Sequence, residues 1–143
     1  MRFLKRLFRS FIKSSREISG DGGKESSLPL ARFLTQSNHF NRGKSVVKQA
    51  AFNPPPSLRL SVFRIDGLNS KSVVQLSSKH ILGKTLYGWA KLTEKNVQKN
   101  GLSLDLNEDP ERHADIVGWP EDKDRRKIIA LELANASTLM LMV

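Results

Sequence analysis

The chain has 143 residues, 38% of them hydrophobic and 7% aromatic, which is enough for one domain with a modest core. It has no cysteine, which excludes disulfides, thiolate metal sites, iron–sulfur clusters and a cysteine nucleophile. Its formal net charge is +10 and no run of eighteen apolar residues occurs, so composition favours an anionic partner and excludes a membrane-spanning helix.

Residues 1–16 have the pattern of a basic amphipathic helix. Their apolar residues recur at helical spacing and form one stripe: Phe3, Leu4, Leu7, Phe8, Phe11 and Ile12. Lys and Arg occupy the other side, which fits packing on the protein's own domain, binding to an anionic membrane surface, or a targeting presequence. Residues 17–29 are rich in Gly and Ser and predict a flexible linker to a folded domain at residues 30–143.

The first half of that domain contains one clear strand and one clear helix. The sequence LARFLTQS at 30–37 fits a strand or a short helix, and the three prolines at 54–56 enforce an extended segment. The sequence SLRLSVFRIDG at 57–67 is apolar on both faces, which predicts a central strand. Residues 69–81 predict a short helix with Asn69 or Ser70 as its N-cap.

The second half repeats this alternation. Residues 85–92 predict a strand, and Thr93 is the expected N-cap of the helix that follows. Residues 113–117 predict a further strand, and Pro120 suits the first turn of the last helix. The terminal sequence TLMLMV predicts a final strand.

Strands and helices therefore alternate from residue 30 to the end of the sequence. This order predicts a single small domain of the α+β class, or the α/β class, with a mixed sheet and about three helices. The basic amphipathic helix at residues 1–16 is expected to precede this domain.

Common catalytic signatures are absent from the sequence. It has no G-x-x-x-x-G-K-[ST] loop, no G-x-G-x-x-G loop and no G-x-S-x-G elbow. The three histidines are far apart and lack the spacing of a metal pair, so we expect no metal site and no cofactor.

One constellation of polar residues remains. Arg64 and Asp66 are two positions apart near the end of one predicted strand, and His113 and Asp115 are two apart on another. If these strands are neighbours, the four side chains line one end of the sheet. They would then hold a nucleotide or a phosphorylated ligand, with His113 as general acid or base oriented by Asp115. The alternative is a structural ion pair and a histidine that caps a loop.

Basic residues in the segment before the central strand are candidate phosphate contacts. Residues 31–99 contain twelve Lys or Arg and two acids, whereas residues 100–143 contain five Lys or Arg and nine acids. The candidate binding residues are Arg32, His39, Arg42, Lys44 and Lys48. Such residues contact the phosphate backbone without reading a base sequence.

Two stretches resemble those of a family of small bacterial proteins whose activity is unknown. They are AFNPPPSLRLSVFRIDGL and RHADIVGWPEDKDRRKIIALELA. In that family a proline run precedes S-V-F-R-x-D-G-L, and H-A-x-I-x-G-W-P-x-D-K precedes the last helix. The resemblance covers about residues 31–137 and implies a bacterial cytoplasmic protein, but no activity.

These observations favour a small basic intracellular binding or regulatory module without catalysis, which contacts nucleic acid or an acidic partner. The first alternative is an enzyme that acts on a nucleotide or phosphorylated ligand through Arg64, Asp66, His113 and Asp115. The second is a membrane-surface adaptor anchored by residues 1–16, which would make the cytoplasmic protein membrane-associated.

Overall fold

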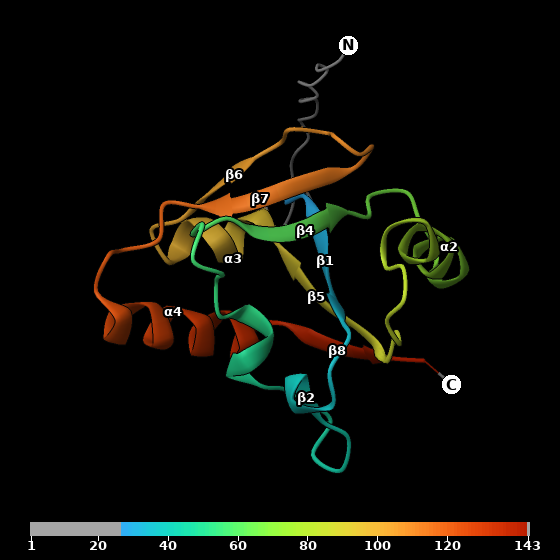
Figure 1. The fold of residues 1–143 in the computed structure, drawn as a ribbon, viewed down its shortest axis with the longest axis horizontal. Helices are drawn as coiled ribbons and strands as arrows, with labels where there is room; N and C mark the ends of the chain where they lie inside the picture. The colour runs from blue at the N-terminus through green and yellow to red at the C-terminus, as the bar shows by residue number, and fades with distance from the viewer. Residues whose placement is uncertain (1–26, 143) are drawn as a thin grey trace, which may run out of the picture.

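A six-stranded sheet forms the centre of the computed structural model, which describes residues 27–142 (Figure 1). Its strand order is β6-β7-β4-β1-β5-β8. The strands are β1 (Pro29–Leu34), β4 (Leu60–Arg64), β5 (Gly88–Thr93), β6 (Ser103–Asp105), β7 (His113–Val117) and β8 (Thr138–Leu141). The helix expected at residues 1–16 and most of the expected linker lie outside the described residues.

All pairings in this sheet are antiparallel. The domain therefore belongs to the α+β class, and the prediction of one small domain with a sheet and about three helices is confirmed for residues 27–142. Strand β4 lies between β7 and β1, as its apolar residues on both faces predict.

One face of the sheet carries the larger core. Leu60 and Val62 of β4 pack there against Phe52 and Leu133. Phe52 comes from the 3₁₀ helix η2 (Gln49–Phe52), and Leu133 comes from α4 (Lys123–Ala136). The short helix α3 (Glu94–Lys99) adds Val97 to this core. Burial of these side chains is the main stabilising contribution on this face.

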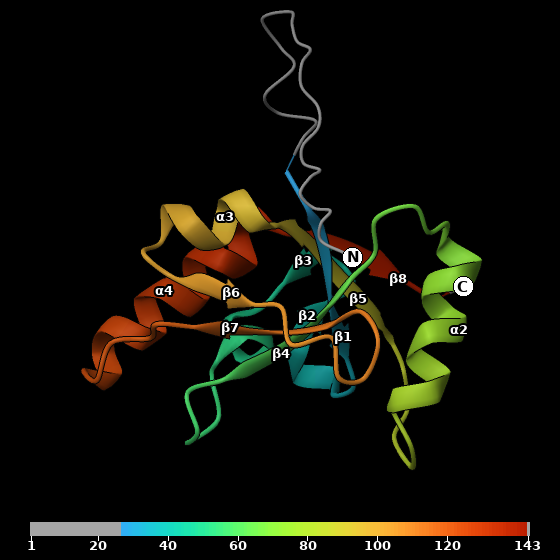
Figure 2. The same ribbon diagram turned by 90° about the horizontal axis from the view of Figure 1, so that it is seen from above.

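Helix α2 (Ser70–His80) packs on the opposite face, as Figure 2 shows. Its Val73 contacts a smaller core that includes Phe33, Phe63 and Trp89. This core lies over β1, β5 and the end of β4. The part of the same face formed by β7 and the start of β4 carries polar side chains instead.

Side chains cap the three α-helices at their N-termini. Of the two expected N-caps of α2, Asn69 is the one observed: its Oδ1 atom accepts a hydrogen bond from the backbone N–H of Ser72. Thr93 and Asn96 form a capping box at the start of α3. Helix α4 begins at Lys123 and not near Pro120, because Asp122 is extended and caps the helix through Asp124 N–H.

A two-stranded hairpin precedes β4 and extends from the domain (Figure 1). It consists of β2 (Phe40–Asn41) and β3 (Val46–Val47), which pair antiparallel. Phe40 and Val47 are buried and attach the hairpin to the larger core. Within residues 27–142, no helix has the length and apolar composition needed to cross a bilayer.

Candidate functional site

The two strands that carry the predicted catalytic residues are direct neighbours. In the antiparallel register of β4 and β7, Phe63 pairs with His113 and Ser61 pairs with Asp115. Paired residues project from the same face of a sheet, and successive residues alternate between faces. The side chains of Ser61, His113 and Asp115 therefore share a face, whereas Arg64 starts on the other face.

Arg64 belongs to an ion-pair group at the end of β4. Its Nη1 lies 2.6 Å from Asp66 Oδ1, and its Nε and Nη2 donate to the Glu108 carboxylate at 2.7 and 3.0 Å. Arg112 Nη1 donates to the Asp66 carbonyl at 3.0 Å. Hydrogen bonding to Arg64 lowers the pKa of Glu108, and the hydrogen bond to Glu108 raises the pKa of Arg64. The guanidinium N–H groups of Arg64 therefore already donate to carboxylates, and a phosphate would have to compete with these carboxylates for them.

His113 belongs to a second group, which includes two residues that the sequence did not indicate. Its Nε2 lies 2.7 Å from Ser61 Oγ, and its Nδ1 lies 2.7 Å from Asn107 Oδ1. Phe63 contacts the imidazole ring edge-on, with ring centroids 5.2 Å apart. His80 of α2 stacks on Phe63 with a centroid separation of 4.9 Å.

Asp115 completes this second group from the middle of β7. Its Oδ2 accepts hydrogen bonds from Asn107 Nδ2 at 3.0 Å and from Arg59 Nε at 3.1 Å. Its Oδ1 lies 3.7 Å from His113 Nε2. Asp105 of β6 also accepts a hydrogen bond from Arg59. This hydrogen bond raises the pKa of the Arg59 guanidinium. Asp115 is largely buried, with 12% of its side chain exposed, whereas Asp105 is 46% exposed.

The four predicted catalytic residues are therefore divided between two groups. Arg64 and Asp66 form one with Glu108 and Arg112, and no side-chain hydrogen bond among residues 27–142 joins them to His113 or Asp115. Alternation along the strands separates them, because Arg64 follows the residue that pairs with His113.

Ser61 and Asn107 join the second group through tertiary structure alone. Ser61 is 52 positions from His113 in the chain and meets it only because of the β4–β7 register. Asn107 is placed by the loop between β6 and β7. The sequence could have indicated Ser61 only by its position two residues before Phe63, which places both side chains on the same face of the strand. Nothing in the local sequence indicates Asn107.

Two of the predicted binding residues lie inside the domain. Arg32 donates from Nε to the Ala51 carbonyl at 2.8 Å and from Nη1 to the Ser61 carbonyl at 3.1 Å. Burial lowers the pKa of Arg32 to about 10. His39 is 6% exposed, and its Nδ1 has no hydrogen-bond partner within residues 27–142. Burial and the nearby charge of Arg32 lower the pKa of His39.

The other three predicted binding residues lie on the hairpin or directly after it. Arg42, Lys44 and Lys48 are exposed, and none takes part in an ion pair in the part of the chain that the structure describes. The guanidinium of Arg42 lies 5.9 Å from the centre of the Phe40 ring. Asn41 Oδ1 accepts a hydrogen bond from Lys44 N–H at 3.0 Å, which fixes the loop between the strands.

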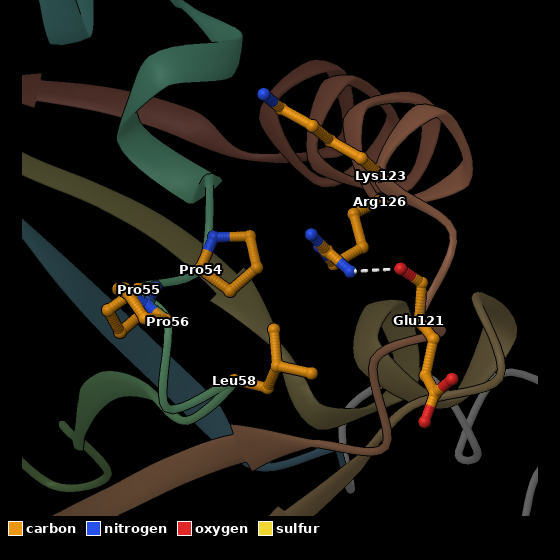
Figure 3. A pocket seen from close by; sticks show the side chains of 7 residues that line it. All are labelled: Pro54, Pro55, Pro56, Leu58, Glu121, Lys123 and Arg126. Atoms are coloured by element: carbon orange, nitrogen blue, oxygen red, sulfur yellow. Dashed lines mark hydrogen bonds between the residues drawn. The ribbon is translucent and has the colours of Figure 1, made fainter.

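An open pocket of about 450 Å³ lies between the proline run and the start of α4 (Figure 3). Its lining comprises Pro54, Pro55, Pro56, Leu58, Glu121, Lys123 and Arg126. Arg126 Nη1 donates to the carbonyls of Pro120 at 3.0 Å and Glu121 at 2.6 Å. Arg126 thus holds the turn before α4, and the prolines form one wall of the pocket.

The fold and these groups define an α+β domain with a basic hairpin and a polar network on the sheet face formed by β7 and the start of β4. No protein-family model, curated protein or solved structure matches the chain.

Proposed function

We propose that the protein is a nucleic-acid-binding module whose β2–β3 hairpin contacts the phosphate backbone. The observation that carries this proposal is a group of three exposed cations on the hairpin and directly after it, Arg42, Lys44 and Lys48, which have no ion-pair partner within residues 27–142. Such cations bind phosphates without first breaking an internal ion pair.

The distribution of acids supports the same surface. No Asp or Glu occurs between residues 26 and 65, so the hairpin has no acid of its own. The acids Asp66, Asp105, Glu108 and Asp115 pair with arginines near β4, β6 and β7. Arginine charge is therefore partly neutralised at that end of the domain, whereas residues 40–48 carry cations and no acid of their own.

The anchoring of the hairpin supports the proposal as well. Phe40 is buried and packs on Tyr87 with ring centroids 5.5 Å apart, and Lys48 N–H donates to the His39 carbonyl at 2.8 Å. The base of the hairpin is thus fixed while its tip is exposed. A fixed base lowers the conformational entropy that the cations lose when they bind a phosphate backbone.

The test is fluorescence anisotropy with a labelled 20-base-pair DNA duplex and a labelled single-stranded RNA, over a series of salt concentrations. A variant with Arg42→Ala, Lys44→Ala and Lys48→Ala should bind more weakly. In a plot of the logarithm of the association constant against the logarithm of the salt concentration, the slope of this variant should be less steep by about 1 for each phosphate that the hairpin no longer neutralises. The duplex and the single strand show which form of nucleic acid the hairpin accepts.

The matched control is a variant with Lys71→Ala, Lys79→Ala and Lys84→Ala. These exposed lysines lie on and just after α2, so the variant loses the same three positive charges at another place. It should keep the wild-type slope. Equal losses of affinity in both variants, or no binding of either nucleic acid at low salt, would refute the role of the hairpin.

A further inference from the structure

We propose that Ser61, His113 and Asn107 form a nucleophilic site for acyl transfer, which accepts the acyl group of an activated ester on Ser61 Oγ. The site lies on the sheet formed by β4 and β7 and is independent of the hairpin. Ser61 Oγ is 2.7 Å from His113 Nε2, and His113 Nδ1 is 2.7 Å from Asn107 Oδ1. This is the sequence of contacts that joins a nucleophile, its general base and the group that orients the base.

The hydrogen bonds also determine which imidazole nitrogen carries the proton. Asp115 accepts from Asn107 Nδ2 at 3.0 Å, so the amide oxygen of Asn107 points to the histidine. An amide oxygen only accepts, and His113 must therefore donate from Nδ1. The lone pair of Nε2 then faces Ser61, whose hydroxyl donates to it. This is the tautomer in which histidine removes a proton from serine.

Further contacts hold these groups in place. Arg59 bridges Asp115 and Asp105, which fixes the carboxylate that orients Asn107. Arg32 donates to the carbonyl of Ser61 at 3.1 Å from the other face of the sheet. Asp115 Oδ1, at 3.7 Å from His113 Nε2, stabilises the imidazolium that forms when the serine loses its proton. Positioning by a rigid sheet is what a nucleophilic site requires.

Within residues 27–142, Ser61 and His113 both keep part of their surface exposed. The core beneath α2 includes Phe63 but not Ser61, and Ser61 is partly exposed. The His113 side chain is 15% exposed, so it is mostly shielded from water yet reachable next to Ser61. The ring of Phe63 lies next to His113, and the ring of His80 stacks on Phe63 on the side of the site nearest α2. An apolar acyl group as small as acetyl suits a site bordered by these rings.

The chemistry balances without any cofactor. Ser61 Oγ forms a bond to the ester carbonyl carbon while its proton passes to His113 Nε2. The bond from that carbon to the leaving oxygen breaks, and the leaving oxygen takes the proton from Nε2. Water then attacks the acyl carbon and gives a proton to His113 Nε2. The bond from that carbon to Ser61 Oγ breaks, and Oγ takes the proton from Nε2. The net reaction converts an ester and water to a carboxylic acid and an alcohol.

The test is covalent labelling of the full chain with p-nitrophenyl acetate, read by intact mass and peptide mapping. Acetylation should occur on Ser61, with a burst of p-nitrophenol. Ser61→Ala should abolish this label, and His113→Gln should slow it about 100-fold, which is the usual contribution of a general base. Ser78→Ala, which changes an exposed serine of α2, should label as the wild type does. Thermal unfolding of each variant shows that it is folded.

The variant Asn107→Asp tests whether Asn107 positions the His113 ring for the reaction or only stabilises the fold. A carboxylate next to Nδ1 favours the imidazolium, so the acid limb of the pH–rate profile should move to higher pH while Ser61 still labels. Asn107→Leu should lose labelling and remain folded. Labelling that is absent from Ser61, or that is unchanged in His113→Gln, would overturn the proposal and would leave the hairpin proposal untouched.

Discussion

Asp115 binds Arg59 and Asn107 through the same carboxylate oxygen, Oδ2, at 3.1 and 3.0 Å. The arginine comes from the residue before β4, and the asparagine comes from the loop after β6. One buried carboxylate therefore connects β7 with the loop that precedes it and with the start of β4, 56 positions away in sequence. Its neighbour Asp105 also pairs with Arg59 but is far more exposed, which allows the two acids to be compared.

Asp115→Ala should destabilise the domain by about 1–3 kcal/mol, because Arg59 and Asn107 both lose a partner in a shielded place. Asp105→Ala should cost less than about 1 kcal/mol, since it removes an exposed ion pair. Urea unfolding followed by circular dichroism measures both. Equal costs for the two variants would show that burial of Asp115 does not set the strength of the network.

Arg32→Met should destabilise the domain by about 2–4 kcal/mol, because the carbonyls of Ala51 and Ser61 lose a charged donor. Arg32→Lys should restore only part of this loss, since one ammonium group cannot reproduce the fork of two donors. Arg42→Met on the exposed hairpin is the control and should change stability by less than about 0.5 kcal/mol. Urea unfolding midpoints of the three variants and the wild type provide the comparison.

His39 should make the domain sensitive to mild acid. Its pKa is lowered in the folded state by burial and by Arg32, so below the ordinary histidine pKa the unfolded chain binds a proton that the folded chain does not. Stability from this source is present above about pH 6.5 and is lost as the pH falls below it. The melting temperature measured from pH 8 to pH 5 should therefore fall less steeply in His39→Leu than in the wild type. Parallel curves would exclude His39 as the cause.

Thr93→Ala should cost about 1 kcal/mol, because it removes the hydroxyl that accepts from Asn96 N–H at the start of α3. Asn96→Ala should cost a similar amount, because Asn96 Oδ1 accepts from Thr93 N–H at 2.9 Å. The double variant should lose less than the sum, since the two side chains form one reciprocal cap. Thr85→Ala, at an exposed position before β5, is the matched control and should leave the melting temperature unchanged.

Local patterns in the sequence predicted most of the secondary structure. The alternation around Leu60 and Val62 predicted a central strand, and Asn69 and Thr93 predicted two helix starts. These features depend on neighbouring residues only, through side-chain alternation and capping hydrogen bonds. The start of α4 was placed too early, because Pro120 is also compatible with the turn that Arg126 holds before the helix.

Local sequence patterns predicted only part of the candidate site. The sequence indicated that the segments around Arg64 and His113 carry polar residues, and the structure places these segments on adjacent strands. It did not indicate Ser61 or Asn107, nor that Arg32 and His39 lie inside the domain. Those facts depend on register and on packing between distant segments.

Residue type and local spacing were enough to predict where most strands and helices lie, the basic character of residues 40–48 and the lack of cysteine chemistry. Which polar side chains meet depends on tertiary contacts between distant strands. A shift of one residue in the pairing of β4 with β7 would turn Ser61 away from His113, and nothing local to either strand fixes that pairing. The register is set by burial of Leu60, Val62, Ala114 and Ile116 in one core, and the polar network on the opposite face follows from it.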